Sequence, residues 1–169
     1  MKVFKEIQRF TQSWILLLIG GITVFVFYTL FKDYNRIKET ATNEDLSGLI
    51  IPAVILILVF VLFLIIKLET RIDETGVYYQ FFPFHFKLKK IGWDGLKAIE
   101  VRKYSPIMEY GGWGIRGLSR KSRRGMAFNV SGNMGIQLVL KDGGRLLLGT
   151  KMPDKARETI NNYLYKLKE

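Results

Sequence analysis

The densest group of chemically active side chains in this sequence is a run of cations between residues 116 and 124. The run places five positive charges within nine residues and consists of Arg116, Arg120, Lys121, Arg123 and Arg124. Trp113 precedes them and has a glycine on either side. Guanidinium and ammonium groups bind carboxylates and phosphates, and an indole suits an interface between water and lipid. The segment 105–125 is therefore the candidate contact site.

Three interpretations of this segment remain open at the level of the sequence. It is a solvated loop, a contact for anionic lipid head groups, or a contact for an acidic protein partner. A stretch of this length without clear periodicity inside a domain favours a functional loop. The sequence matches no nucleic-acid-binding motif, so no nucleic-acid partner is expected.

The remaining residue types argue against an enzyme. The chain has no cysteine, which excludes disulfides, thiolate metal ligands and cysteine nucleophiles. His85 is the only histidine, and the alternation with Phe84 and Phe86 predicts that it lies on the outer face of a strand. No nucleophile–base set, carboxylate pair or phosphate loop stands out by spacing. The sequence therefore predicts no catalytic residue, no cofactor and no metal site.

Two uncharged apolar runs dominate the first part of the chain. Residues 14–31 form a run of 18 and residues 48–66 a run of 19. As helices these runs would be roughly 27–28 Å long, close to the thickness of the bilayer interior. The exit of the first run lacks a signal-peptide cleavage pattern. The two runs are predicted to be transmembrane helices that integrate the chain into a lipid bilayer.

The charges around these runs predict their orientation. The N-terminal stub, 1–13, carries +2, and the loop 32–47 between the runs carries −1. Basic residues favour the cytoplasmic side, so both termini are expected in the cytoplasm and the loop outside. The segment 67–169 then forms a cytoplasmic domain, with 20 basic and 10 acidic residues.

The domain 67–169 is expected to be mainly β. Apolar and polar residues alternate over most of it, and Lys-Asp-Gly-Gly at 141–144 predicts a tight hairpin. From Pro153 the period changes to that of an amphipathic helix, with Ala156 and Ile160 on its apolar face. The pattern predicts seven strands followed by one helix.

Several segments of the domain resemble a group of bacterial membrane-anchored proteins with pleckstrin-homology-like domains. The similar segments are EYGGWGIRG (109–117), AFNVSG (127–132), GIQLVLKDGGRLLLGT (135–150) and KMPDKARETI (151–160). The resemblance implies a barrel of seven antiparallel strands closed by a C-terminal helix, in a protein of the bacterial inner membrane. It implies no catalytic residues, because most members of this group have no known function.

These observations together favour a binding or scaffold module. The domain would dock a protein partner or the anionic membrane surface through the basic segment 105–125. The alternative is a small structural subunit of a larger membrane complex that associates through the two-helix hairpin.

Overall fold

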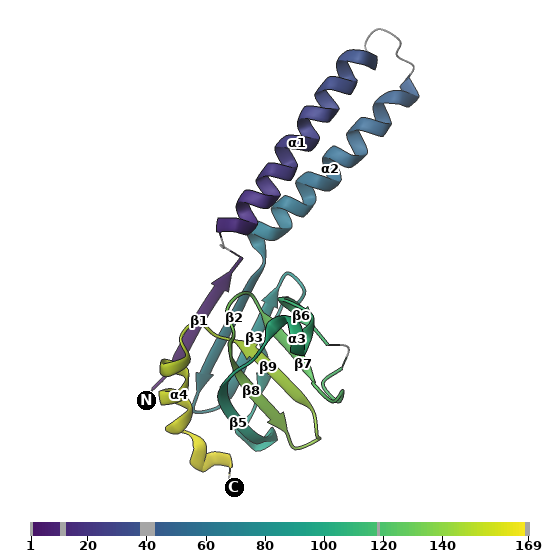
Figure 1. Ribbon diagram of the computed structural model, residues 1–169. Helices are drawn as coiled ribbons and strands as arrows, with labels where there is room; N and C mark the ends of the chain where they lie inside the picture. The colour runs from purple at the N-terminus through teal and green to yellow at the C-terminus, as the bar shows by residue number, and fades with distance from the viewer. Residues whose placement is uncertain (1, 11–12, 38–42, 118, 168–169) are drawn as a thin grey trace. The chain divides into compact units, whose positions relative to one another are not determined.

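A computed structural model gives the structure of residues 2–10, 13–37, 43–117 and 119–167 (Figure 1). The chain divides into two compact units. The first combines the N-terminal nine residues with residues 66–169, and the second is the segment 10–65 between them.

The first sheet of the β-rich unit has four antiparallel strands in sequential order. They are β1 (Phe4–Arg9), β2 (Lys67–Asp73), β3 (Gly76–Phe82) and β4 (Lys89–Ile91). Buried and exposed residues alternate strictly along β1, with Phe4, Glu6 and Gln8 on its buried face. The sequence analysis missed this strand, since it treated residues 1–13 as a stub.

The second sheet has five strands in the order β5-β8-β9-β7-β6. They are β5 (Leu96–Lys103), β6 (Gly114–Arg116), β7 (Met126–Asn129), β8 (Met134–Leu140) and β9 (Arg145–Gly149). The predicted hairpin at 141–144 is confirmed, because β8 and β9 pair antiparallel on either side of it. By contrast, β7 and β9 run parallel.

The two sheets pack against each other through aromatic rings. The ring of Phe128 on β7 lies 5.4 Å from that of Tyr79 and 6.0 Å from that of Phe81, both on β3. All three side chains are almost fully buried. Burial of such rings contributes several kcal/mol each, so this contact is a major source of cohesion. Aliphatic side chains complete the core, among them Leu68, Ile72, Ile136, Leu138, Leu146 and Leu148.

Helices cover the ends of the β-rich unit. The predicted C-terminal helix is present as α4 (Pro153–Asn161), which buries Ala156, Thr159 and Ile160. A short helix, α3 (Pro106–Tyr110), and two 3-10 turns, η1 (Trp93–Gly95) and η2 (Leu164–Leu167), complete the unit.

Polar side chains of β1 fasten it to the end of β9. The Gln8 amide donates to the carbonyl of Gly149 at 2.7 Å. The Glu6 carboxylate accepts from the Thr150 hydroxyl at 2.6 Å and from the Lys151 amide at 2.8 Å. These buried hydrogen bonds join the first sheet to the second and give the N-terminal strand a structural role.

The second unit is a helical hairpin. It consists of α1 (Ser13–Ile37) and α2 (Asn43–Ile65), which lie side by side (Figure 1). Much of the predicted loop 32–47 therefore belongs to the two helices, while residues 38–42 lie outside the described residues.

The structure contradicts the predicted transmembrane spans 14–31 and 48–66. A membrane-spanning helix needs about 20 consecutive apolar residues. In the part of the chain that the structure describes, no helix is both long enough and apolar enough to cross a membrane. The longest stretches with described side chains are 16–32 in α1 and 50–65 in α2. The predicted multi-pass location in the bacterial inner membrane depended on those spans, so the same finding contradicts it.

The predicted barrel of seven antiparallel strands is also wrong. The described residues form nine strands in two sheets, and one pair of strands is parallel. The two unpredicted strands are β1, whose partner is far away in sequence, and β6, which lies inside the glycine-rich segment. In addition, Phe84, His85 and Phe86, which were expected on a strand, lie in a turn, and β4 begins only at Lys89.

Candidate functional site

The candidate segment 105–125 begins with a helix whose ends are encoded in its sequence. Ser105 caps α3, since its hydroxyl accepts a hydrogen bond from the amide of Met108 at 3.3 Å. Pro106 occupies the first turn, where no amide hydrogen is needed. Gly111 ends the helix in the left-handed conformation, with φ of 75°. These three residues fix where Glu109 and Tyr110 lie.

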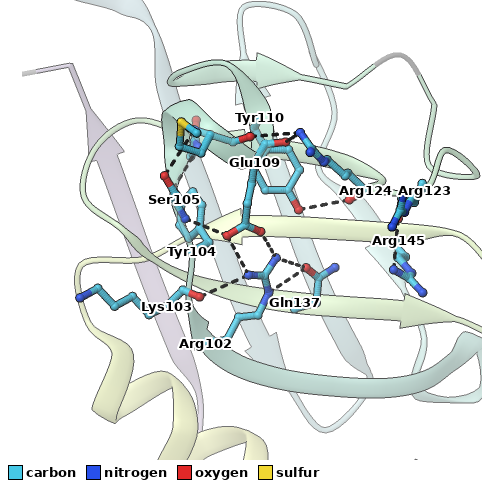
Figure 2. Close-up of polar contacts among 12 residues, drawn as sticks. Arg102, Lys103, Tyr104, Ser105, Glu109, Tyr110, Arg123, Arg124, Gln137 and Arg145 are labelled. Atoms are coloured by element: carbon cyan, nitrogen blue, oxygen red, sulfur yellow. Dashed lines mark hydrogen bonds and ion pairs between the residues drawn. The ribbon is translucent and has the colours of Figure 1, made fainter.

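A buttressed ion pair attaches α3 to the second sheet (Figure 2). The Arg102 guanidinium on β5 donates to both oxygens of Glu109, at 2.8 and 3.3 Å. The side-chain oxygen of Gln137 on β8 accepts from Arg102 at 3.1 and 3.3 Å, and the amide of Ser105 donates to Glu109 at 2.8 Å. Arg102 and Glu109 thus hold each other in a fixed geometry.

Hydrogen bonding sets the ionisation of Glu109. The hydrogen bond from Arg102 lowers the pKa of the Glu109 carboxyl, against a smaller opposing effect of partial burial. The Ser105 amide and the charge of Arg124 lower this pKa further. Glu109 is therefore a carboxylate that is already satisfied by its neighbours, which makes it a structural group and a poor proton donor.

The basic loop 119–125 lies against α3 and the start of β9. The Arg124 guanidinium donates to the carbonyls of Met108 and Glu109, both at 3.1 Å, and the Tyr110 hydroxyl donates to the carbonyl of Arg124 at 3.2 Å. Arg145 on β9 donates from its amide to the Arg120 carbonyl and from its guanidinium to the Arg123 carbonyl. These contacts order the backbone of the loop.

Gly125 permits the close approach of this loop to β9. Its φ is +76°, and a Cβ atom added there would lie 2.4 Å from the Arg145 carbonyl oxygen. No other residue fits without moving the backbone.

An open pocket of about 540 Å³ lies between the loop, α3 and the second sheet. Its lining is Glu100, Arg102, Glu109, Tyr110, Arg123, Arg124, Gln137, Val139 and Arg145. A second depression of about 580 Å³ shares part of this lining and adds Ile107 and Met108. The side chains of Ile107 and Met108 are 63% and 78% exposed. The pocket thus offers guanidinium groups next to an accessible apolar surface.

The cations of this surface differ in how far they are engaged. Arg102 is paired with Glu109, and Arg124 and Arg145 donate to backbone carbonyls. Among the described residues, the Arg123 guanidinium and the Lys121 ammonium have no hydrogen bond or ion pair, and both residues are exposed. These two cations are therefore available to an external anion.

The structure divides the predicted contact residues into separate groups. The Trp113 indole donates to the carbonyl of Gly132 at 3.1 Å, and Arg116 donates to the carbonyl of Trp113 at 2.9 Å. The Arg120 guanidinium hydrogen-bonds the hydroxyl of buried Tyr79 and lies over its ring at 5.9 Å. Of the predicted residues, only Arg123 and Arg124 line the pocket.

The sequence analysis missed Arg102, Glu109 and Arg145 as parts of this surface. Arg102 and Arg145 are single cations at strand positions, and only the pairing of β5, β8 and β9 brings them next to the loop. Ser105 followed by Pro106 was a local signal, since a serine cap and a proline in the first turn mark the start of a helix.

Within the part of the chain that the structure describes, no group of three His, Asp or Glu side chains could hold a metal ion. No protein-family model, curated protein or solved structure is similar to this chain at a significant level.

Proposed function

We propose that the β-rich unit is a binding module that docks an acidic segment of a protein partner in the pocket beside loop 119–125. The observation that carries the proposal is a pair of cations on the loop that are unengaged among the described residues: Arg123, which lines the pocket, and Lys121, two residues before it. Arginine binds carboxylates through a planar fork of donors, and an ordered loop loses little entropy on binding.

The lining of the pocket favours a particular kind of segment. Ile107 and Met108 provide an exposed apolar surface next to the cations, and methionine adapts well to different partner side chains. Glu100 and Glu109 line the adjoining pocket of about 540 Å³, so a uniformly anionic polymer would meet carboxylates there. The preferred ligand is thus a peptide in which Asp or Glu residues flank a large apolar side chain.

Peptide binding to the full-length chain tests this function. The probe is a fluorescein-labelled decapeptide with one Leu between Glu residues, and the readout is fluorescence anisotropy at low and high salt. Exposed charge pairs contribute about 0.2–1 kcal/mol each, so Lys121→Gln with Arg123→Gln should weaken binding by about fivefold. Among the described residues, neither side chain has a hydrogen bond or ion pair to lose, so the fold should be unchanged.

The matched control removes the same charge elsewhere. Lys97 and Lys141 are exposed and do not line the pocket, so Lys97→Gln with Lys141→Gln should retain binding. Equal weakening in both variants would reduce the effect to net charge and refute the assigned surface. If a peptide without Leu binds equally well, the apolar part of the proposal is refuted.

The helical hairpin supports a second candidate function, that of a subunit held in a larger complex. Large apolar side chains point outward from both helices, for example Leu17 at 76% exposure, Phe25 at 66% and Leu58 at 62%. Such a surface is typical of helices that pack against a partner. A photo-crosslinking residue at position 25 or 58 should give a discrete protein adduct in cells. A chain that migrates alone after crosslinking would refute the subunit role.

A further inference from the structure

The turn that joins β3 to β4 exposes aromatic side chains on the surface of the β-rich unit. Within this turn, residues 83–88, the side chain of Phe84 is 58% exposed, that of Phe86 82% and that of Leu88 38%. Large apolar side chains gathered in this way on a short turn are unusual on a protein surface and indicate a contact site.

The exposed rings result from an inverted alternation. The sequence analysis placed His85 on the outer face of a strand, which would turn Phe84 and Phe86 inward, and this is wrong. The His85 ring faces the core instead, 5.1 Å from the ring of Phe128 and 5.8 Å from that of Tyr79. Its neighbours Phe84 and Phe86 consequently point outward.

His85 also fixes the backbone of the turn. Its amide donates to the carbonyl of Phe81 at 2.8 Å, and its carbonyl accepts from the side chain of Gln80 at 3.0 Å. Its Nδ1 accepts from the amide of Phe81 at 3.3 Å. The outward position of the two phenylalanines is therefore built into the turn.

Lysines follow the exposed rings closely in the sequence. Lys87, Lys89 and Lys90 are all exposed. Lys90 lies over the ring of Tyr78 at 5.7 Å, and Lys67 on the neighbouring strand lies over the ring of Phe82 at 5.9 Å. The sequence has no carboxylate from Thr75 to Trp93. Among the described residues, none of the three exposed lysines forms an ion pair. The segment 83–90 thus carries cations and no carboxylate of its own, with apolar side chains at the turn.

We infer that the segment 83–90 docks on the surface of an anionic lipid bilayer. Phe84 and Phe86 would enter the head-group region, where apolar and aromatic side chains are stabilised, while the lysines contact the anionic head groups. The charge complementarity and the absence of carboxylates favour lipid over an apolar protein surface. This contact is peripheral and requires no membrane-spanning helix. It uses a different surface and a different class of partner from the proposed peptide pocket.

A fluorescent label at position 86 tests the inference in the full-length chain. Because the chain lacks cysteine, Phe86→Cys creates a single attachment site for an environment-sensitive dye such as NBD. With vesicles of phosphatidylcholine containing about 30% phosphatidylglycerol, the dye emission should shift to shorter wavelength and increase. Pure phosphatidylcholine should give a much smaller response, and added salt should weaken the response to the anionic vesicles.

Two controls make the result specific to this turn. The same dye at Lys141→Cys, in the exposed turn between β8 and β9, should not respond, even if another part of the chain binds vesicles. In the labelled chain, Lys87→Gln, Lys89→Gln and Lys90→Gln together should weaken vesicle binding by up to about 100-fold, since each lysine near an anionic surface contributes about fivefold. Near-ultraviolet circular dichroism checks that the core is intact.

Three outcomes would overturn the inference. They are no response at position 86, an equal response to neutral and anionic vesicles, and an unchanged response in the triple lysine variant. The variant Lys121→Gln with Arg123→Gln should respond like the wild type. Failure of the lipid contact and failure of the peptide pocket are thereby distinguishable.

Discussion

Loop 119–125 and the segment 83–90 are both rich in cations and close to aromatic rings, yet they are built in opposite ways. In the loop, Arg120 and Arg124 are engaged by a tyrosine hydroxyl and by backbone carbonyls. At the turn, the lysines form no ion pair among the described residues and the rings of Phe84 and Phe86 are exposed. Two of the four cations in the loop are thus engaged within the fold, whereas the lysines of segment 83–90 have no carboxylate partner among the described residues.

This difference shows that charge density along a sequence does not measure the availability of that charge. Five cations stand within residues 116–124, but among the described residues only the side chains of Lys121 and Arg123 lack a hydrogen bond or ion pair in this segment. The segment 83–90 has three lysines, Lys87, Lys89 and Lys90, and among the described residues none of them forms an ion pair. Lys90 lies over the Tyr78 ring at 5.7 Å, which leaves Lys87 and Lys89 as the unengaged ones. Guanidinium groups with several donors readily satisfy nearby carbonyls, whereas a compact ammonium on a flexible stem tends to remain hydrated.

The largest expected effect comes from Tyr79, because it supports both regions. Its hydroxyl contacts Arg120 of the loop, and its ring contacts His85 of the turn. Tyr79→Ala should lower the free energy of unfolding by about 3–5 kcal/mol, as for other large buried side chains. Tyr79→Phe should cost only about 1 kcal/mol, because it removes the hydroxyl and keeps the ring. Urea denaturation measures both values. If the two variants lost equal stability, the Tyr79 ring would not be what supports the two regions.

A smaller effect, confined to the loop side, is expected at Arg102. Arg102→Ala leaves Glu109 without its bidentate partner and should lower the free energy of unfolding by about 1–2 kcal/mol. This value is that of a charged hydrogen-bond pair, reduced because the pair is partly exposed to solvent. The double variant with Glu109→Gln should cost less than the sum of the single ones. The emission of a dye at position 86 should be unchanged. A response there would show that the two regions are coupled.

The pH dependence of Glu109 follows from the same pair. Its pKa is lowered from an ordinary value of 4.5, so the unfolded chain binds the proton more readily than the folded one. The pair therefore stabilises the fold above pH 4.5, and this contribution is lost as the pH falls through the lowered pKa. Arg102→Ala should flatten this acid dependence in urea denaturation series.

His85 gives the turn its own pH dependence. Burial, followed by the charges of Lys89 and Arg120, lowers the pKa of the imidazole from an ordinary value of 6.5. The neutral ring is therefore favoured in the folded state, and stability should fall as the pH drops below 6.5. His85→Gln should remove this loss of stability below pH 6.5. The prediction would be contradicted if the free energy of unfolding of the wild type stayed constant from pH 7 down to the acid range in which Glu109 titrates.

The smallest effect on stability is expected at Phe86. Its side chain is 82% exposed, so Phe86→Ser should change the free energy of unfolding by less than about 0.5 kcal/mol. Phe84→Ser should cost somewhat more, because the Phe84 ring lies 6.1 Å from the buried Phe81 ring. A large loss of stability in Phe86→Ser would show that the ring serves the fold and would weaken the contrast between the two regions.

Local patterns predicted part of the fold. The turn residues at 141–144 predicted the β8–β9 hairpin. The proline at 153 and the apolar spacing after it predicted α4. Both signals lie within a few residues of the structure they specify. By contrast, β1 pairs with a strand almost sixty residues away, and β6 contains only three residues. Pairings of this kind depend on tertiary contacts that no short window contains.

The candidate site was predictable to a similar degree. The sequence identified the loop, since its cations are adjacent in the chain. It could not show that Arg120 turns toward Tyr79, or that Arg145 lies against the loop, because these contacts join separate elements. The inverted turn at Phe84–Phe86 was missed because alternation was continued past Pro83, beyond the end of β3.

The register between the first two strands has a practical consequence for protein engineering. Arg9 is paired directly with Lys67, so the chain leaves the first sheet and returns to it at neighbouring positions. A two-residue turn such as Asn-Gly could connect antiparallel strands in this register. A minimal chain of residues 2–9, that turn and residues 67–167 would keep all nine described strands. A fragment that starts at residue 67 would lack the strand carrying Glu6 and Gln8, and with it the hydrogen bonds that join the two sheets.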